Sequence, residues 1–129
     1  MGQTYTVEAK FIFKNNDSES FCKVFRDEIK SRDGVTAIFL PYEEDDLKTP
    51  FGLFNILTAK NAMTAYDSNG NENPDIWVSD FDGSYGWESV LYDIFSSVLK
   101  ECENGSWVKV WPDNGLTKLT VKNGKVTIR

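Results

Sequence analysis

The chain has 129 residues, with 20 acidic and 14 basic side chains, a formal net charge of −6 and no histidine. This length predicts a single domain over residues 1–129, and no apolar run reaches the roughly 18 residues of a membrane span. The lack of histidine excludes Ser-His-Asp hydrolysis, histidine-ligated metals and histidine phosphotransfer, which leaves carboxylate, lysine, tyrosine or cysteine chemistry.

The first forty residues predict a strand, a helix and a strand. Residues 4–13 alternate between apolar and polar side chains, which is the period of a half-buried strand. Asp17 or Ser18 is expected to cap a helix that runs to about Arg32. The apolar run at 35–40 predicts a second strand. The start of the chain lacks the apolar region of a secretory signal, so we expect a cytoplasmic location.

The middle of the chain predicts shorter elements. Residues 42–48 form an acidic loop, and Thr49-Pro50 is typical of a helix start. Residues 51–57 are then expected to form a short buried helix, with a strand as the alternative. A strand is also expected at 61–66, a polar loop at 67–74 and a strand at 76–81.

The segment at 85–103 gives the clearest helical pattern in the sequence. Its apolar residues recur with a period of 3.6 and form one wide stripe, which must be covered by other elements. The stripe consists of Trp87, Val90, Leu91, Ile94, Phe95, Val98, Leu99 and Cys102.

The last part of the chain predicts a three-stranded meander. Residues 106–111 and 116–122 alternate, and Asn123-Gly124 favours a tight type I′ turn into a final strand. The expected fold class is therefore α+β. A mostly antiparallel sheet with this meander packs on two main helices, at about 17–32 and 85–103.

Cys22 and Cys102 are the two cysteines of the chain. Each lies on an apolar helical stripe, so we interpret both as buried thiols in a reducing compartment. A disulfide that joins the two helices is the alternative, provided that their Cβ atoms face each other.

Residues 76–84, IWVSDFDGS, combine an apolar strand with a D-x-D-G-S sequence. This segment resembles the first motif of haloacid-dehalogenase-type phosphatases. The resemblance implies that Asp80 is a nucleophile, that Asp82 is a general acid and base, and that a magnesium ion binds beside them. The alternative is a strand-to-helix turn in which Asp and Ser cap the following helix. Apart from this metal, we expect no cofactor.

The loop that begins at Asp67 has the D-x-N-x-N spacing of the first ligands of a calcium loop. Glu72 occupies the sixth position, where that loop requires glycine, and Val78 occupies the twelfth, where it requires glutamate. A solvated loop is therefore the preferred interpretation, with a different kind of cation site as the alternative.

Charge is unevenly distributed along the chain. Residues 61–99 contain seven acids and no base, whereas residues 104–129 contain five bases and one acid. We expect the acidic surface to attract a basic protein partner and to repel nucleic acid, so that direct nucleic-acid binding is not expected. Four consecutive acids, hereafter the acidic run, would contribute to this surface. They are Glu43, Glu44, Asp45 and Asp46.

Trp107 and Trp111 share one strand face, with Lys109 between them and Val108 and Val110 on the other face. If the valines face the core, both tryptophans face outward and can anchor a partner. If the tryptophans are inside, the valines lie at the rim, and a core position for at least one tryptophan is the default expectation.

Two functions follow from these patterns. The first is a small, acidic, non-enzymatic protein-binding or inhibitor module, similar in size and charge to immunity proteins and phage-encoded inhibitors. Its partner-binding residues would be the acidic run and the two tryptophans. The second is a carboxylate-based metal-dependent enzyme centred on Asp80 and Asp82.

Overall fold

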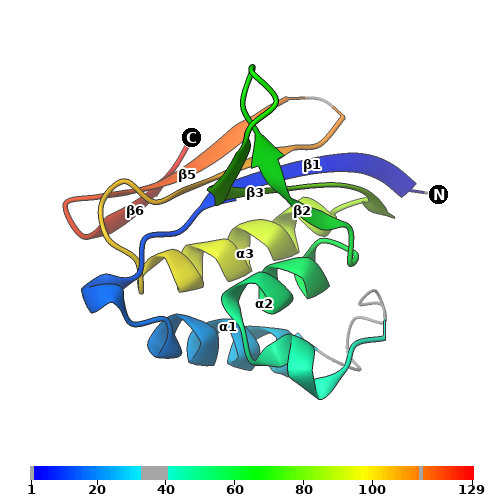
Figure 1. Cartoon of the computed structure of the whole chain (residues 1–129). Coiled ribbons are helices and arrows are strands. Elements are labelled where there is room, and N and C mark those ends of the chain that lie inside the picture. The colour runs from blue at the N-terminus through cyan, green and yellow to red at the C-terminus, as the bar shows by residue number, and fades with distance from the viewer. Residues whose placement is uncertain (1, 33–40, 114) are drawn as a thin grey trace.

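In the computed structural model, which describes residues 2–32, 41–113 and 115–129, six antiparallel strands form one sheet with helices packed on one face (Figure 1). The α+β class is thereby confirmed. The strands are β1 Gly2–Lys10, β2 Ala62–Tyr66, β3 Glu72–Ser84, β4 Trp107–Trp111, β5 Thr117–Lys122 and β6 Lys125–Ile128. The helices are α1 Glu19–Arg32, α2 Pro50–Leu57 and α3 Trp87–Leu99, with short 3₁₀ turns η1 Lys14–Asn16 and η2 Glu44–Leu47.

The strand order is β2-β3-β1-β4-β5-β6, so β1 lies inside the sheet between β3 and β4. In this register, Val7 of β1 lies opposite Ser79 of β3 and Val110 of β4. The C-terminal meander is confirmed as β4, β5 and β6. Asn123 and Gly124 both have positive φ angles, 53° and 74°, as a type I′ turn requires.

The sheet packs one face on the helices, and its alternating side chains supply about a third of the buried apolar residues of the described chain. Tyr5, Val7 and Ala9 of β1 are fully buried. So are the valines of β4, Val108 and Val110. These residues face α3, which lies directly beneath the sheet (Figure 1).

The apolar stripe of α3 is buried as its period predicts. Phe95 lies at its centre with no exposed surface, and its ring centroid is 6.1 to 6.3 Å from those of Phe11, Phe25 and Phe54. This one side chain therefore joins α3 to α1, to α2 and to the segment after β1. The helix is shorter than expected: it begins at Trp87 and ends at Leu99.

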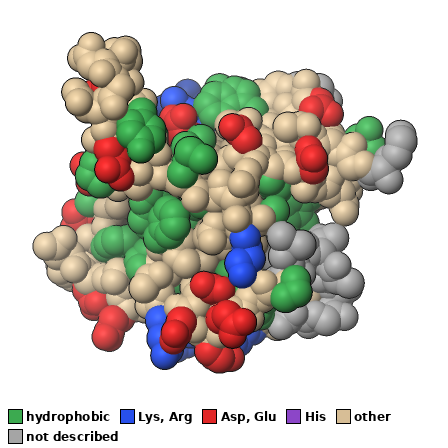
Figure 2. Space-filling model, turned by 45° about the vertical axis from the view of Figure 1, so that its right-hand side comes forward, with side chains coloured by type: hydrophobic (Ala, Val, Ile, Leu, Met, Phe, Trp, Pro, Cys, Tyr) green, Lys and Arg blue, Asp and Glu red, His purple; other side chains and the backbone are tan. Residues whose placement is uncertain are grey.

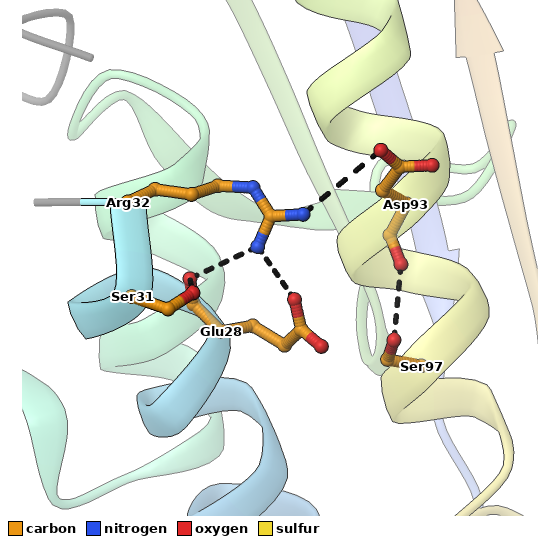
Figure 3. Close-up of polar contacts among 5 residues, drawn as sticks. All are labelled: Glu28, Ser31, Arg32, Asp93 and Ser97. Carbon is orange, nitrogen blue, oxygen red and sulfur yellow. Dashed lines mark hydrogen bonds and ion pairs between the residues drawn. The ribbon is translucent and has the colours of Figure 1, made fainter. Parts of the chain in front are cut away.

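Arg32 links the end of α1 to α3 (Figure 3). Its Nη1 donates to the Glu28 carboxylate at 2.5 Å, and its Nη2 lies 3.9 Å from the Asp93 carboxylate on α3. Because Asp93 is largely exposed, this ion pair contributes at most about 1 kcal/mol.

Tyr5 of β1 anchors the beginning of α3 to the sheet. Its single hydroxyl proton is shared between two acceptors, Glu88 Oε2 at 2.6 Å and Ser84 O at 2.8 Å. Burial, followed by the hydrogen bond to Glu88, raises the pKa of Tyr5 to about 12.

Both cysteines are free and buried, in agreement with the interpretation as thiols. Burial raises the pKa of Cys102 to about 12 and also raises the pKa of Cys22. Neither thiol is therefore poised for nucleophilic chemistry near neutral pH.

The start of α2 follows from Thr49-Pro50, and the helix interpretation of residues 51–57 is confirmed. Thr49 caps the helix, its hydroxyl accepting from Gly52 N at 3.0 Å, and Pro50 occupies the first turn. After the helix, Ala59 and Lys60 have φ angles of 60° and 58°. This left-handed conformation is unfavourable for residues with a side chain.

Substitutions at Ala59 test this conformation. We expect Ala59→Gly to raise the free energy of unfolding by about 0.5 kcal/mol, because glycine adopts positive φ without strain. Ala59→Val should lower it by roughly 2 kcal/mol, because a β-branched residue is a genuine outlier there. Urea unfolding of the three proteins checks the order Gly, Ala, Val; a glycine variant less stable than the valine variant would contradict it.

The bounds of two expected segments differ in the structure, and a third segment falls outside the described residues. Residues 67–74 are not all loop, because β3 already begins at Glu72 and pairs with β2 through an irregular register at Thr64 and Ala65. The strand expected at 76–81 is longer at both ends, because β2 pairs with β3 from Glu72 and β1 pairs with it as far as Ser84. The strand expected at 35–40 falls outside the described residues.

In the described part of the chain, no helix is both long and apolar enough to cross a membrane.

Candidate functional site: the outer face of the sheet

The sheet face turned away from α1, α2 and α3 is hereafter called the outer face (Figure 1). Strand pairing brings residues from distant parts of the sequence together on it. On β1, Thr6 lies opposite both Asp80 of β3 and Trp111 of β4, and Lys10 lies opposite Trp107. One complete row crosses from β2 to the residue after β6. It consists of Met63, Val78, Glu8, Lys109, Lys118 and Arg129.

Trp107 and Trp111 both lie on the outer face and are half-buried, whereas Val108 and Val110 are fully buried beneath them. The structure therefore places neither tryptophan in the core. The ammonium group of Lys109, between them on the strand, lies 4.8 Å from the centroid of the Trp107 ring. This is a cation–π contact, which holds the lysine over the ring.

The outer face is divided by charge. Its acids, Glu8, Asp80 and Asp82, lie on β1 and β3. The opposite half carries only bases among its charged strand residues, namely Lys109, Lys118, Lys122, Lys125 and the adjoining Arg129. Within the described chain, none of these bases forms an ion pair, although acids outnumber bases 20 to 14 overall.

A groove of about 450 Å³ lies in the basic half. Thr120 and Thr127 lie opposite each other on neighbouring strands, with their hydroxyl oxygens 2.8 Å apart. Cationic side chains flank this pair along β5, and Trp107 lies at its inner side on β4. The outer-face residues that line the groove are Trp107, Lys118, Thr120, Lys122, Thr127 and Arg129.

Asp80 and Asp82 project from the same strand onto the outer face. The Asp80 carboxylate accepts from the Thr6 hydroxyl at 2.6 Å, and that of Asp82 accepts from the Thr4 hydroxyl at 3.2 Å. The D-x-D-G-S segment is thus part of β3, not a strand-to-helix turn. Among the described residues, no group of three or more acids or cysteines is arranged to hold a metal ion.

The interpretation of Asp and Ser as caps of the following helix is wrong. The N-cap residue of α3 is Gly86, with φ 85° and no side-chain hydrogen bond. A left-handed glycine reverses the chain between β3 and α3, so that no capping side chain is used.

The acidic run is engaged largely in its own local structure. It forms the 3₁₀ turn η2 beside α2, where Glu43 and Asp46 make a reciprocal capping box. Asp45 pairs with Lys48 at 2.9 Å, and Asp46 lies 3.7 Å from Lys60. On the side shown in Figure 2, acidic side chains lie in upper and lower groups and do not form one continuous patch. The acidic run, which belongs to the helical layer, does not join Trp107 and Trp111 in one surface.

Single substitutions in η2 should separate structural from exposed acids. We expect Asp46→Ala to lower the free energy of unfolding by about 1 kcal/mol, because it removes the capping box. Glu44→Ala, at an exposed position, should change it by less than about 0.5 kcal/mol. Thermal and urea unfolding measure both, and equal effects would show that the capping box contributes nothing.

The loop from Asp67 is a hairpin connection between β2 and β3. The Asp67 carboxylate accepts from the backbone N–H groups of Asn69 and Asn71, each at 2.9 Å. This turn geometry explains the D-x-N-x-N spacing without a bound cation.

The sequence predicted neither Thr120 nor Thr127 as a site residue. It placed Lys118, Lys122 and Arg129 among the C-terminal bases without predicting a site for them. The signal that locates them is the Asn123-Gly124 turn, because the turn fixes the register of β5 against β6. Alternation then places these residues on one face.

Comparison of the chain with protein-family models, with curated proteins and with solved structures finds no match.

Proposed function

We propose that this protein is a non-enzymatic binding module that recognises a protein partner through the outer face of its sheet. The observation that carries the proposal is the placement of Trp107 and Trp111 on this face, above a core that is already filled by Val108 and Val110. Tryptophan is the residue type most enriched at the energetic centres of protein interfaces.

The charge division constrains the partner. A basic region of the partner fits Asp80, Asp82 and Glu8, whereas the region that meets the tryptophans must accommodate the bases around them. The sequence led us to expect that a basic partner binds the acidic run. Because that run is largely engaged in the structure of η2, we now expect the outer face to be the main contact. An inhibitor or immunity role in the cytoplasm is consistent with two free, buried thiols.

The experiment compares capture of a partner from extracts of the native host by three immobilised proteins. Wild type and Tyr85→Ala should retain the same protein, because Tyr85 is exposed but lies between β3 and α3, outside the sheet. Trp107→Ala/Trp111→Ala should retain at least tenfold less. Hydrogen exchange of the complex should protect amides of β4 and β5 more than those of α1; protection confined to α1 or η2 would overturn the proposal.

The alternative, a metal-dependent enzyme centred on Asp80 and Asp82, is less well supported, because each carboxylate already accepts a hydrogen bond from a threonine of β1. A magnesium titration followed by NMR separates the two functions. Saturable shifts at both aspartates, lost in Asp80→Asn, would favour the enzyme.

A further inference from the structure

The groove in the basic half of the outer face has the chemistry of an anion site. Lys118 and Arg129 flank it on one side and Lys122 on the other, and the hydroxyls of Thr120 and Thr127 lie between. Cations and hydroxyl donors together satisfy a carboxylate, which accepts several hydrogen bonds. No acid within the described chain neutralises these cations by an ion pair.

We propose that this groove binds an acidic, extended peptide segment of the protein partner, with side-chain carboxylates on Lys118, Lys122 and Arg129. This inference rests on the proposed function and adds the chemistry of the segment recognised. The segment crosses β5 and β6 and ends at Trp107, whose neighbour Lys109 can pair with a further carboxylate.

Charge complementarity alone would also admit a single-stranded nucleic acid, but two observations favour the peptide. The ammonium of Lys109 lies over the Trp107 ring, 4.8 Å from its centroid, where a stacked base would have to displace it. Asp80, Asp82 and Glu8 occupy the other half of the same face, so a phosphate backbone that continued beyond the groove would meet like charge.

The probe is a decapeptide of alternating glutamate and serine, titrated into the full chain and followed by NMR. We expect saturable shifts at the Thr120 and Thr127 amides and at the Trp107 indole. The affinity should fall steeply with salt, because several ion pairs form together. A lysine–serine decapeptide, inorganic phosphate and a twelve-nucleotide oligothymidylate serve as comparison ligands.

Charge reversal of two lysines in the groove tests directly whether these cations bind the acidic peptide. Lys118→Glu/Lys122→Glu changes two exposed side chains and should bind the acidic peptide at least tenfold more weakly while gaining affinity for the lysine–serine peptide. The matched control is Lys23→Glu, a reversal on the exposed surface of α1, which should bind as wild type. Thermal unfolding of each variant confirms that the fold is kept.

Each outcome decides the inference. It is overturned if the acidic peptide gives no saturable shifts, if Lys23→Glu weakens binding as much as the groove variant, or if oligothymidylate or phosphate binds more tightly at the same residues. Loss of partner capture by the tryptophan variant with no peptide binding would reject the groove and retain the proposed function. If the acidic peptide binds and the tryptophan variant captures the partner as well as wild type does, the groove is retained and the proposed function is rejected.

Discussion

Phe95→Ala should lower the free energy of unfolding by roughly 3–5 kcal/mol. The phenyl ring is fully buried, and its centroid lies within 6.3 Å of the rings of Phe11, Phe25 and Phe54, which come from three other segments. Alanine would leave a cavity where these elements meet, and a rigid, close-packed core collapses only partly around it. A domain of this size has about 5–15 kcal/mol in total.

Urea unfolding at neutral pH measures this loss. The matched control is Ser89→Ala, an exposed position on the same helix, which should change stability by less than about 0.5 kcal/mol. A loss of under about 1 kcal/mol for Phe95→Ala would mean that the aromatic cluster is not the centre of the core.

The second large effect is a loss of stability at alkaline pH. The pKa of Tyr5 is raised to about 12 from an ordinary value of 10.0, and that of Cys102 to about 12 from 9.0. Both groups thus keep their protons longer in the folded state than in the unfolded chain. Stability should be unaffected below about pH 9 and fall from there toward pH 12, by up to about 1.4 kcal/mol per pH unit for each group that only the unfolded state has deprotonated.

Two variants assign this slope. Tyr5→Phe should be less stable than wild type at pH 8, because it loses the hydrogen bonds to Ser84 and Glu88, and its stability should fall less between pH 10 and 12. Cys102→Ala should flatten the profile from pH 9. Tyr66→Phe, which alters an exposed side chain, is the control. Profiles that are parallel for all four proteins would show that neither buried group is responsible.

The elements with strong local signals were predictable from sequence. The stripe of α3, the Thr49-Pro50 start of α2 and the Asn123-Gly124 turn each depend on residues close together in the chain. The strand order was not predictable, because the insertion of β1 between β3 and β4 depends on contacts between distant segments. The extension of β3 back to Glu72 was missed for the same reason: pairing with β2 overrides a local sequence rich in Asn and Pro.

The direction of the two tryptophans on β4 could not be predicted from the sequence. The parity of Trp107 and Trp111 was evident, but both faces of that strand are apolar, so the sequence left their direction open. The direction is set by register, because Val108 lies between Ala9 and Leu119 in the core. In the acidic run, the capping box gives two of the four members a structural role that the charge pattern did not reveal, and their part in binding stays a prediction.

The position of β1 inside the sheet has a consequence for how the chain folds during synthesis. Thr6 precedes its neighbour Asp80 by 74 residues, and β4 follows later still. At translation rates of about 5–20 residues per second, β1 waits roughly 4–15 s on the ribosome before its first partner strand has been made. During that time α1 and then α2, which belong to the helical layer beneath the sheet, are made. The strands that carry the two tryptophans and the basic groove are made after all three helices, so the outer face is completed last.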